Sequence, residues 1–181
     1  MELVYPGEII KQDMYKSCSP ASQGRFNVTG KIVICETWLS ENIDKGEVVK
    51  RAGGAAMILL SQSWDRFTTK SEAHVLPTAH LSHADSLKVV SYFRTTKNGM
   101  ATIVFGGTQS GVRRSRAVAS FSSRRPSLRN GGILKPDVVG PGVDILAAWH
   151  KQVGPKPTRS PDTAFNFASG CPWQHLYSLG S

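Results

Sequence analysis

The stretch that decides the fold begins Gly30-Lys31-Ile32-Val33-Ile34-Cys35 and ends Ala55-Ala56-Met57-Ile58-Leu59-Leu60. Both ends are short apolar runs without alternation, which is typical of strands that are covered on both faces of a sheet. Residues 42–52 lie between them and are followed by Gly53-Gly54, a pair that commonly ends a helix. The stretch therefore predicts a strand, a short amphipathic helix and a second buried strand.

The helix over 42–52 is expected to have an apolar and a charged face. Its apolar residues are Ile43, Val48, Val49 and Ala52, and its outward-facing residues are expected to be Lys45, Glu47, Lys50 and Arg51. A second helix is predicted from His83 to about Thr95, because Ser82 is a good N-cap and Asp85 follows three residues later. This helix is expected to bury Leu87, Val90 and Phe93.

Further strands are predicted over residues 74–81 and 101–105. Pro77 places the first at a sheet edge or at a strand start, because proline has no N–H for the ladder. A buried strand is also expected over 144–149, and the weak alternation of residues 117–122 is compatible with a further strand. Residues 1–29 contain many turn formers and predict short strands and loops, and Trp64 and Phe67 are candidate anchors for the polar loop that follows Leu60.

The composition limits the classes of partner. The apolar content of 40% can support a core, and no apolar run approaches the roughly 18 residues of a membrane helix. The first residues lack the basic and apolar regions of a signal peptide. The formal charge of +9 comes largely from one arginine-rich segment without interleaved aromatic residues, so no specific nucleic-acid binding is predicted. The arginines are Arg113, Arg114, Arg116, Arg124, Arg125 and Arg129.

The cysteines allow two readings. Cys18 and Cys35 flank Asn27-Val28-Thr29, which fits the acceptor pattern for N-glycosylation. A disulfide between the two cysteines would contribute about 3 kcal/mol in the chain-entropy model. Alternatively, Cys35 is a buried thiol at a strand end. The residues alone leave these readings about even.

Two classes of site are not supported. A nucleotide-binding fold needs a glycine-rich turn before its helix, and residues 36–40 contain no glycine. His80 and His83 are close in sequence, but the cysteine pairs of a zinc module are absent. No metal site and no cofactor are therefore predicted.

Several collinear motifs carry a family resemblance. Residues 118–124, Gly132-Ile133-Leu134-Lys135-Pro136-Asp137 and 140–149 resemble the FSSRGP, GILKPD and GPGV-ILAAW patterns of the plant subtilisin-like serine proteases (subtilases). Residues 30–35 and 52–55, with Leu76-Pro77, resemble the protease-associated (PA) domain inserted in those enzymes. The resemblance covers about residues 1–150.

The resemblance implies an α+β fold. A PA domain, expected as a small open β-barrel or sandwich with two helices, would cover residues 1–110. A linker at 111–115, an incomplete piece of the α/β peptidase domain at 116–170 and an aberrant tail at 171–181 would follow. It also implies an extracellular location.

The resemblance supplies no catalytic residue to this chain. Such proteases use an aspartate, a histidine and an oxyanion asparagine upstream of the PA domain, and a serine in a GTSM motif downstream. After Phe165-Asn166-Phe167-Ala168-Ser169-Gly170 the chain continues with Cys171-Pro172 instead of Thr-Ser-Met. Ser169 precedes the glycine of the motif and is not the nucleophile, and Arg125 replaces a family glycine.

A truncated, noncatalytic protein is therefore expected. Its PA domain would serve substrate access or contact with another subtilase subunit, with a protein or peptide as the partner. The alternative is the serine endopeptidase activity of a complete parent chain. His74 or His80 with a nearby serine is a further arrangement to test, although each is expected to be a strand-end residue.

Overall fold

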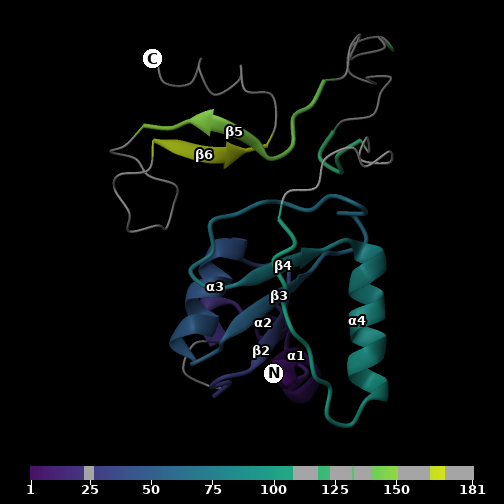
Figure 1. The fold of residues 1–181 in the computed structure, drawn as a ribbon. Helices are drawn as coiled ribbons and strands as arrows, with labels where there is room; N and C mark the ends of the chain where they lie inside the picture. Colours follow the sequence, from purple (N-terminus) through teal and green to yellow (C-terminus); the bar gives the residue numbers. More distant parts are fainter. Residues whose placement is uncertain (23–26, 108–117, 123–131, 133–139, 151–163, 170–181) are drawn as a thin grey trace.

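The computed structural model describes residues 1–22, 27–107, 118–122, 132, 140–150 and 164–169 (Figure 1). Within these residues, the N-terminal unit is built on one four-stranded parallel sheet whose strand order follows the chain. The strands are β1 (Leu3–Val4), β2 (Ile32–Glu36), β3 (Ala56–Leu60) and β4 (Thr78–Leu81). This is a single sheet, and the barrel or sandwich expected from the resemblance is not confirmed.

The two central strands are buried on both sides, as predicted. Ile32 pairs with Ala56 and the ladder continues to Glu36 and Leu60. Because side chains alternate along a strand, the sheet separates two cores. One contains the side chains Val33, Cys35, Met57 and Leu59, together with Val49 of the first long helix. The other contains Ile32, Ile34, Ala56, Ile58 and Leu60 and packs against Val89, Val90 and Phe93 of the second.

Both predicted long helices are confirmed as α3 (Asn42–Arg51) and α4 (His83–Thr95), and Figure 1 shows them on opposite sides of the sheet. The Ser82 hydroxyl accepts the Asp85 N–H at 3.3 Å, so the predicted N-cap is present. The expected burial of Leu87 is wrong, because its side chain is 58% exposed and Val89 packs in the core instead.

The expected outward position of Lys45 is also wrong, since its side chain is fully buried. Lys45 lies three and four residues before Val48 and Val49, and these spacings place the three side chains on one helical face. The position of Lys45 on the apolar face of the helix, and not the charge of its side chain, therefore determines its burial. The Lys45 ammonium group donates to the Ser40 carbonyl and, at 3.3 Å, to Asn42 Oδ1.

The first residues form more helix than predicted. After β1, the chain makes α1 (Pro6–Ile10), α2 (Asp13–Lys16) and the 3-10 turn η1 (Pro20–Ser22). Pro6 at the first helical position suits a helix start. A Cβ on Gly7 would lie 2.5 Å from the Lys16 Cα, so glycine permits the close approach of α1 and α2.

A disulfide ties this N-terminal segment to the sheet. Cys18 and Cys35 are bonded, with their Cα atoms 5.5 Å apart and 17 positions between them in sequence. Both side chains are fully buried in the core that contains Val33 and Met57. The link joins the residues after α2 to the C-terminal half of β2.

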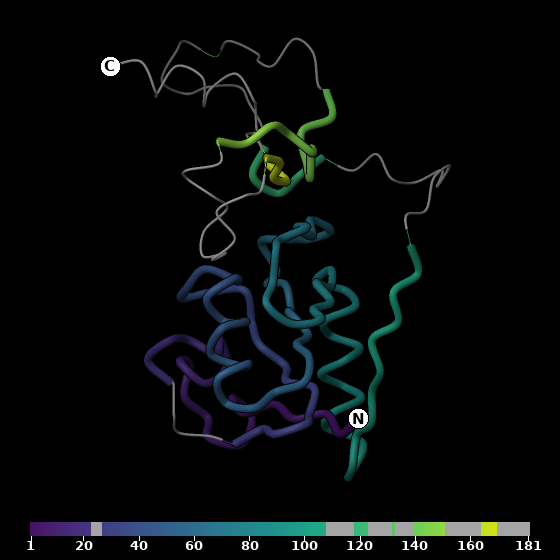
Figure 2. Tube along the Cα trace, turned by 60° about the vertical axis from the view of Figure 1, so that its left-hand side comes forward, coloured from purple at the N-terminus to yellow at the C-terminus, as the bar shows by residue number. Residues whose placement is uncertain are grey.

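Two expected strands differ in the structure. Residues 101–105 run extended without joining the sheet, and the Ala101 N–H donates to the Met1 carbonyl at 2.9 Å. In Figure 2 this extended segment continues along the unit towards the C-terminal hairpin. The strand predicted at 74–81 begins at Thr78, directly after Pro77, as a strand-start proline requires.

The C-terminal described residues form a hairpin of β5 (Ile145–Ala148) and β6 (Phe165–Ala168), paired antiparallel. The strand predicted at 144–149 is thus confirmed, but it is not fully buried, because its residues alternate between half-buried and exposed. Residues 118–122 form a turn instead of a strand. The anchoring roles expected for Trp64 and Phe67 are wrong, since both are exposed.

The predicted linker at 111–115, the tail at 171–181 and all six clustered arginines lie outside the described residues. In the part of the chain that is described, no helix is long and apolar enough to cross a membrane.

Candidate functional site

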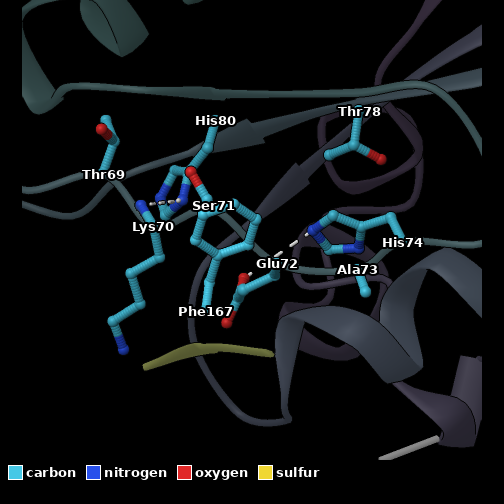
Figure 3. Close-up of a pocket in the computed structure, with 9 residues that line it drawn as sticks. All are labelled: Thr69, Lys70, Ser71, Glu72, Ala73, His74, Thr78, His80 and Phe167. Atoms are coloured by element: carbon cyan, nitrogen blue, oxygen red, sulfur yellow. Dashed lines mark hydrogen bonds and ion pairs between the residues drawn. The ribbon is translucent and has the colours of Figure 1, made fainter. Parts of the chain in front are cut away.

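A cavity of about 430 Å³ lies where the loop between β3 and β4 meets the C-terminal hairpin (Figure 3). The loop supplies most of its wall, β4 supplies two side chains, and β6 supplies one aromatic ring. The lining residues are Thr69, Lys70, Ser71, Glu72, Ala73, His74, Thr78, His80 and Phe167. The cavity therefore combines ionisable, hydroxyl and aromatic groups from segments that are far apart in sequence.

Two carboxylates hold the start of the loop, that of Glu36 at the end of β2 and that of Asp65 in the loop itself. Asp65 Oδ2 accepts from the Thr37 hydroxyl and from the Gln62 N–H, each at 3.0 Å. Gln62 Nε2 donates to Glu36 at 3.0 Å, and the same carboxylate accepts the Trp38 indole N–H at 2.8 Å. These bonds fix the start of the loop to the end of β2.

A chain of polar contacts connects the cavity to the buried lysine of α3. Lys45 donates to Asn42 Oδ1, and Asn42 Nδ2 donates to Glu72 Oε2 at 2.9 Å. Burial lowers the pKa of Lys45 to about 8, although the nearby carboxylates of Glu72 and Asp44 oppose this shift. The charge of Glu72 is thus placed between a buried cation and the cavity.

His74 lies at the inner end of the cavity, and its side chain is only 7% exposed. Its Nε2 is 3.7 Å from Glu72 Oε2, and its buried Nδ1 has no hydrogen-bond partner among the described residues. Burial lowers the pKa of His74 and outweighs the opposite effect of Glu72. His74 is therefore a neutral, packed side chain near neutral pH. A Cβ on Gly46 of α3 would lie 3.4 Å from its Nδ1, so the helix approaches the ring closely.

His80 forms the serine–histidine pair that a nucleophilic mechanism would need, but with the wrong proton arrangement. Its Nε2 lies 3.1 Å from the Ser61 hydroxyl oxygen, and its Nδ1 accepts the Lys70 N–H at 3.1 Å. Burial also lowers the pKa of His80, so the ring is neutral and has one N–H. Because Nδ1 is the acceptor, Nε2 carries the proton and donates to Ser61.

A general base must accept the proton of the nucleophile, and here the histidine donates instead. Ser61 is moreover only 3% exposed, so a substrate does not reach its hydroxyl. His83, which was considered with His80 as a possible metal ligand, donates from Nδ1 to the Ser61 main-chain carbonyl at 3.1 Å. Among the described residues, no three His, Cys, Asp or Glu side chains are grouped so that they could hold a metal ion.

Asp144 joins the loop to the hairpin. Its carboxylate accepts the Ser71 N–H at 2.9 Å and the Ser71 hydroxyl at 3.2 Å. Its own N–H donates to the Ser169 hydroxyl at 3.0 Å. Asp144 has φ of 53°, in the left-handed region that aspartate tolerates better than most residues. The loop has a second contact of this kind, in which the Ser120 N–H donates to the Thr68 hydroxyl at 2.8 Å.

The Ser169 hydroxyl is therefore engaged by Asp144 across the β5–β6 pair and is not an activated nucleophile. Its hydroxyl oxygen accepts from the Asp144 N–H and lies 3.4 Å from the Asp144 carboxylate. The sequence did not reveal Ser71, Asp144 or Phe167 as parts of one site. The only available signal was the polar Asp144 at the start of an apolar strand.

Comparison with known proteins agrees with this architecture. Residues 1–89 match the PA domain family. The Arabidopsis thaliana subtilisin-like protease SBT1.5 is 38% identical over 193 residues, covering 99% of this chain and 25% of that protein. Subtilisin-like protease SBT1.2 of the same plant is 41% identical over 138 residues, covering 76% of this chain and 18% of its own length. The chain thus spans a quarter or less of these relatives, and it belongs to the subtilisin-like proteases of plants as a segment that carries their PA domain.

Proposed function

We propose that this segment is a noncatalytic interaction module whose PA domain presents residues 68–74 to a polypeptide. The observation that carries the proposal is the cavity lined jointly by this loop and by Phe167 of the hairpin. Its volume of about 430 Å³ falls within the roughly 300–1,000 Å³ typical of ligand pockets. A peptide side chain can contact Phe167 there, while its backbone meets the hydroxyl and carboxylate groups of the loop.

The chemistry of the site supports a binding role. His80 donates to Ser61, the Ser169 hydroxyl is engaged by Asp144, and His74 is packed against α3. None of these arrangements supplies the pairing of nucleophile and base that acyl transfer requires. Substrate access is the preferred role. Contact with another subtilase subunit through the same surface is the second form of the proposal, and the resemblance supports an extracellular setting for both.

Photo-cross-linking tests the binding role. The chain is irradiated with decapeptides that carry a benzoylphenylalanine, and the modified residues are mapped by mass spectrometry. Cross-links are expected on residues 68–74 and on β6, and Phe167→Ala should reduce them. Phe165→Ala is the matched control, because Phe165 is an exposed phenylalanine of the same strand that does not line the cavity. Cross-links elsewhere, or equal loss in both variants, would refute the proposal.

The alternative is that the complete protein is a serine endopeptidase. It is favoured by the relatives, which are named subtilisin-like proteases. A fluorophosphonate probe distinguishes the two functions for the 181-residue chain. We expect no serine of this chain to be labelled. Specific labelling of one serine, lost on prior denaturation, would favour the alternative.

A further inference from the structure

The carboxylate of Glu72 lines the cavity without a charged partner of opposite sign. Its Oε2 accepts the Asn42 side-chain amide at 2.9 Å and lies 3.7 Å from His74 Nε2. Burial lowers the pKa of His74, so this ring is neutral near neutral pH and does not balance the charge. Within the described part of the chain, no lysine or arginine forms an ion pair with Glu72, whose side chain is only 22% exposed. A partly buried carboxylate without a counter-ion is unfavourable, so a cationic ligand is favoured at this place.

Two lysines lie near this carboxylate, and neither is paired with it. The Lys45 ammonium group donates to the Ser40 carbonyl and to Asn42 Oδ1, so the Asn42 side chain separates it from Glu72. Lys70 lines the cavity, but it is exposed and its side chain runs away from Glu72 in Figure 3. Among the described residues, Glu72 Oε1 accepts no hydrogen bond, so this oxygen is available to a ligand.

The hydroxyl groups of the cavity are arranged as acceptors. The Ser71 hydroxyl donates its proton to Asp144 at 3.2 Å, and the Thr78 hydroxyl donates to the Leu76 carbonyl at 3.1 Å. Each of these oxygens retains lone pairs with which it can accept a hydrogen bond. The single N–H of His80 is already used within the protein. A ligand that enters the cavity must therefore supply the donors.

Phe167 supplies an aromatic face to the same cavity. Its side chain points from β6 towards the loop in Figure 3, and 50% of the residue is exposed. The face of an aromatic ring carries partial negative charge and attracts a cation that approaches it. An anionic side chain would be repelled by both Glu72 and this ring face, and an aliphatic side chain would leave the acceptors of the wall unpaired. Charge and hydrogen bonding thus select the same class of ligand.

We propose that the cavity is a subsite for an arginine or lysine side chain of the bound polypeptide, with Glu72 as its counter-ion and Phe167 as its aromatic contact. This inference rests on the proposed function and adds the class of residue that is recognised. Arginine is expected to bind more tightly than lysine, because its planar guanidinium group can stack on the ring while its five N–H groups meet several acceptors.

Peptides that differ at one side chain test the subsite on the unaltered protein. Fluorescein-labelled decapeptides of otherwise identical sequence carry arginine, lysine, citrulline, norleucine or glutamate at a central position, and fluorescence anisotropy measures their dissociation constants. Citrulline keeps the length and the planar end group of arginine without its charge. The arginine peptide should bind about tenfold more tightly than the citrulline peptide, which corresponds to about 1.4 kcal/mol. The glutamate peptide should bind most weakly.

The net charge of the chain makes this a demanding test. The formal charge of +9 attracts anionic peptides over long range and repels cationic ones. A preference for arginine therefore cannot arise from the overall charge and requires a local negative group. Repeating the series at higher salt should weaken the general effect of net charge more than the contact inside the cavity, because partly buried pairs are screened less.

Variants of the protein locate the preference. Glu72→Gln keeps an oxygen that can accept from Asn42 but removes the charge, so it should bind the arginine and citrulline peptides about equally. Glu47→Gln is the matched control and should keep the preference, because Glu47 pairs with Arg51 on α3 and does not line the cavity. Urea unfolding checks that both variants are folded, and the peptide series on the wild-type chain does not depend on either.

The outcomes separate the subsite from the proposed function. If all peptides bind equally and their benzoylphenylalanine versions still cross-link to residues 68–74 and β6, the cavity binds polypeptide without recognising a cation, and the subsite is refuted. If folded Glu72→Gln keeps the full arginine preference, the cation is recognised elsewhere, and the subsite is again refuted. If no peptide binds, the proposed function fails and the subsite fails with it.

Discussion

The buried ammonium group of Lys45 gives the stability of the domain an unusual pH dependence. Burial lowers its pKa to about 8 in the folded chain, while an unfolded lysine titrates near 10.5. Between these values the unfolded state binds more protons than the folded state, so the free energy of unfolding rises with pH. The destabilisation caused by the buried charge is therefore complete below pH 8 and disappears as the pH approaches 10.5.

The magnitude follows from the two pKa values. One unit corresponds to about 1.4 kcal/mol, so the full rise is at most about 3 kcal/mol and solvent screening reduces it. Tyr5 sets the upper limit of the useful range, because burial and its hydrogen bond to Glu36 raise the pKa of its hydroxyl. Its contribution to stability is lost as the pH rises above the ordinary tyrosine value near 10.

Urea unfolding at several pH values between 7.5 and 9.5 measures the effect, with the disulfide intact. The wild-type free energy of unfolding should rise across this range. Lys45→Met should remove the rise, because the side chain keeps a similar shape without the titrating group. Lys50→Met is the matched control on the same helix, since Lys50 is exposed. A flat wild-type profile, or the same slope in Lys45→Met, would refute the reasoning.

Three further changes test the packing. Reduction of Cys18–Cys35 should lower stability by about 3 kcal/mol, measured by urea unfolding with and without reductant, and an unchanged midpoint would contradict the role of the bond. Gly54→Ala should destabilise the folded domain by about 1–3 kcal/mol, because the added Cβ would lie 2.5 Å from Val49 Cγ1. If thermal unfolding of this variant occurs at the wild-type temperature, the fold accommodates the methyl group and the prediction is wrong. Leu87→Asp should change the free energy of unfolding by no more than about 0.5 kcal/mol, and a larger loss would place this side chain in the core.

The central strands were predictable because their evidence is local. Continuous apolar runs at 32–35 and 56–60 indicate burial on both faces, and the Ser82 cap marks the start of α4. Lys45 was misplaced because its residue type was given more weight than its spacing from Val48 and Val49. That spacing already indicated the buried face, and the acceptors Ser40 and Asn42 just before the lysine satisfy its ammonium group.

The site could not be predicted because its parts meet only through tertiary structure. Ser71 and Asp144 are separated by 73 positions, and neither belongs to a motif that requires the other. The proton arrangement of His80 likewise depends on the Lys70 N–H, which no sequence pattern places beside the ring. The family resemblance was enough to predict the PA domain, whereas the conformation of the loop at residues 68–74 depends on tertiary contacts that the sequence does not indicate.

The loop of the PA domain is joined to the C-terminal hairpin through Ser71 and Asp144. The most direct test is hydrogen exchange of the Ser71 amide, measured by NMR in the wild-type chain and in Asp144→Ala. The Lys70 amide is an internal control, because it donates to His80 within the PA domain. We expect the Ser71 amide to be protected in the wild-type chain and to exchange faster in Asp144→Ala, while the exchange of the Lys70 amide is unchanged. An unprotected wild-type Ser71 amide, or equal exchange in both proteins, would contradict this connection.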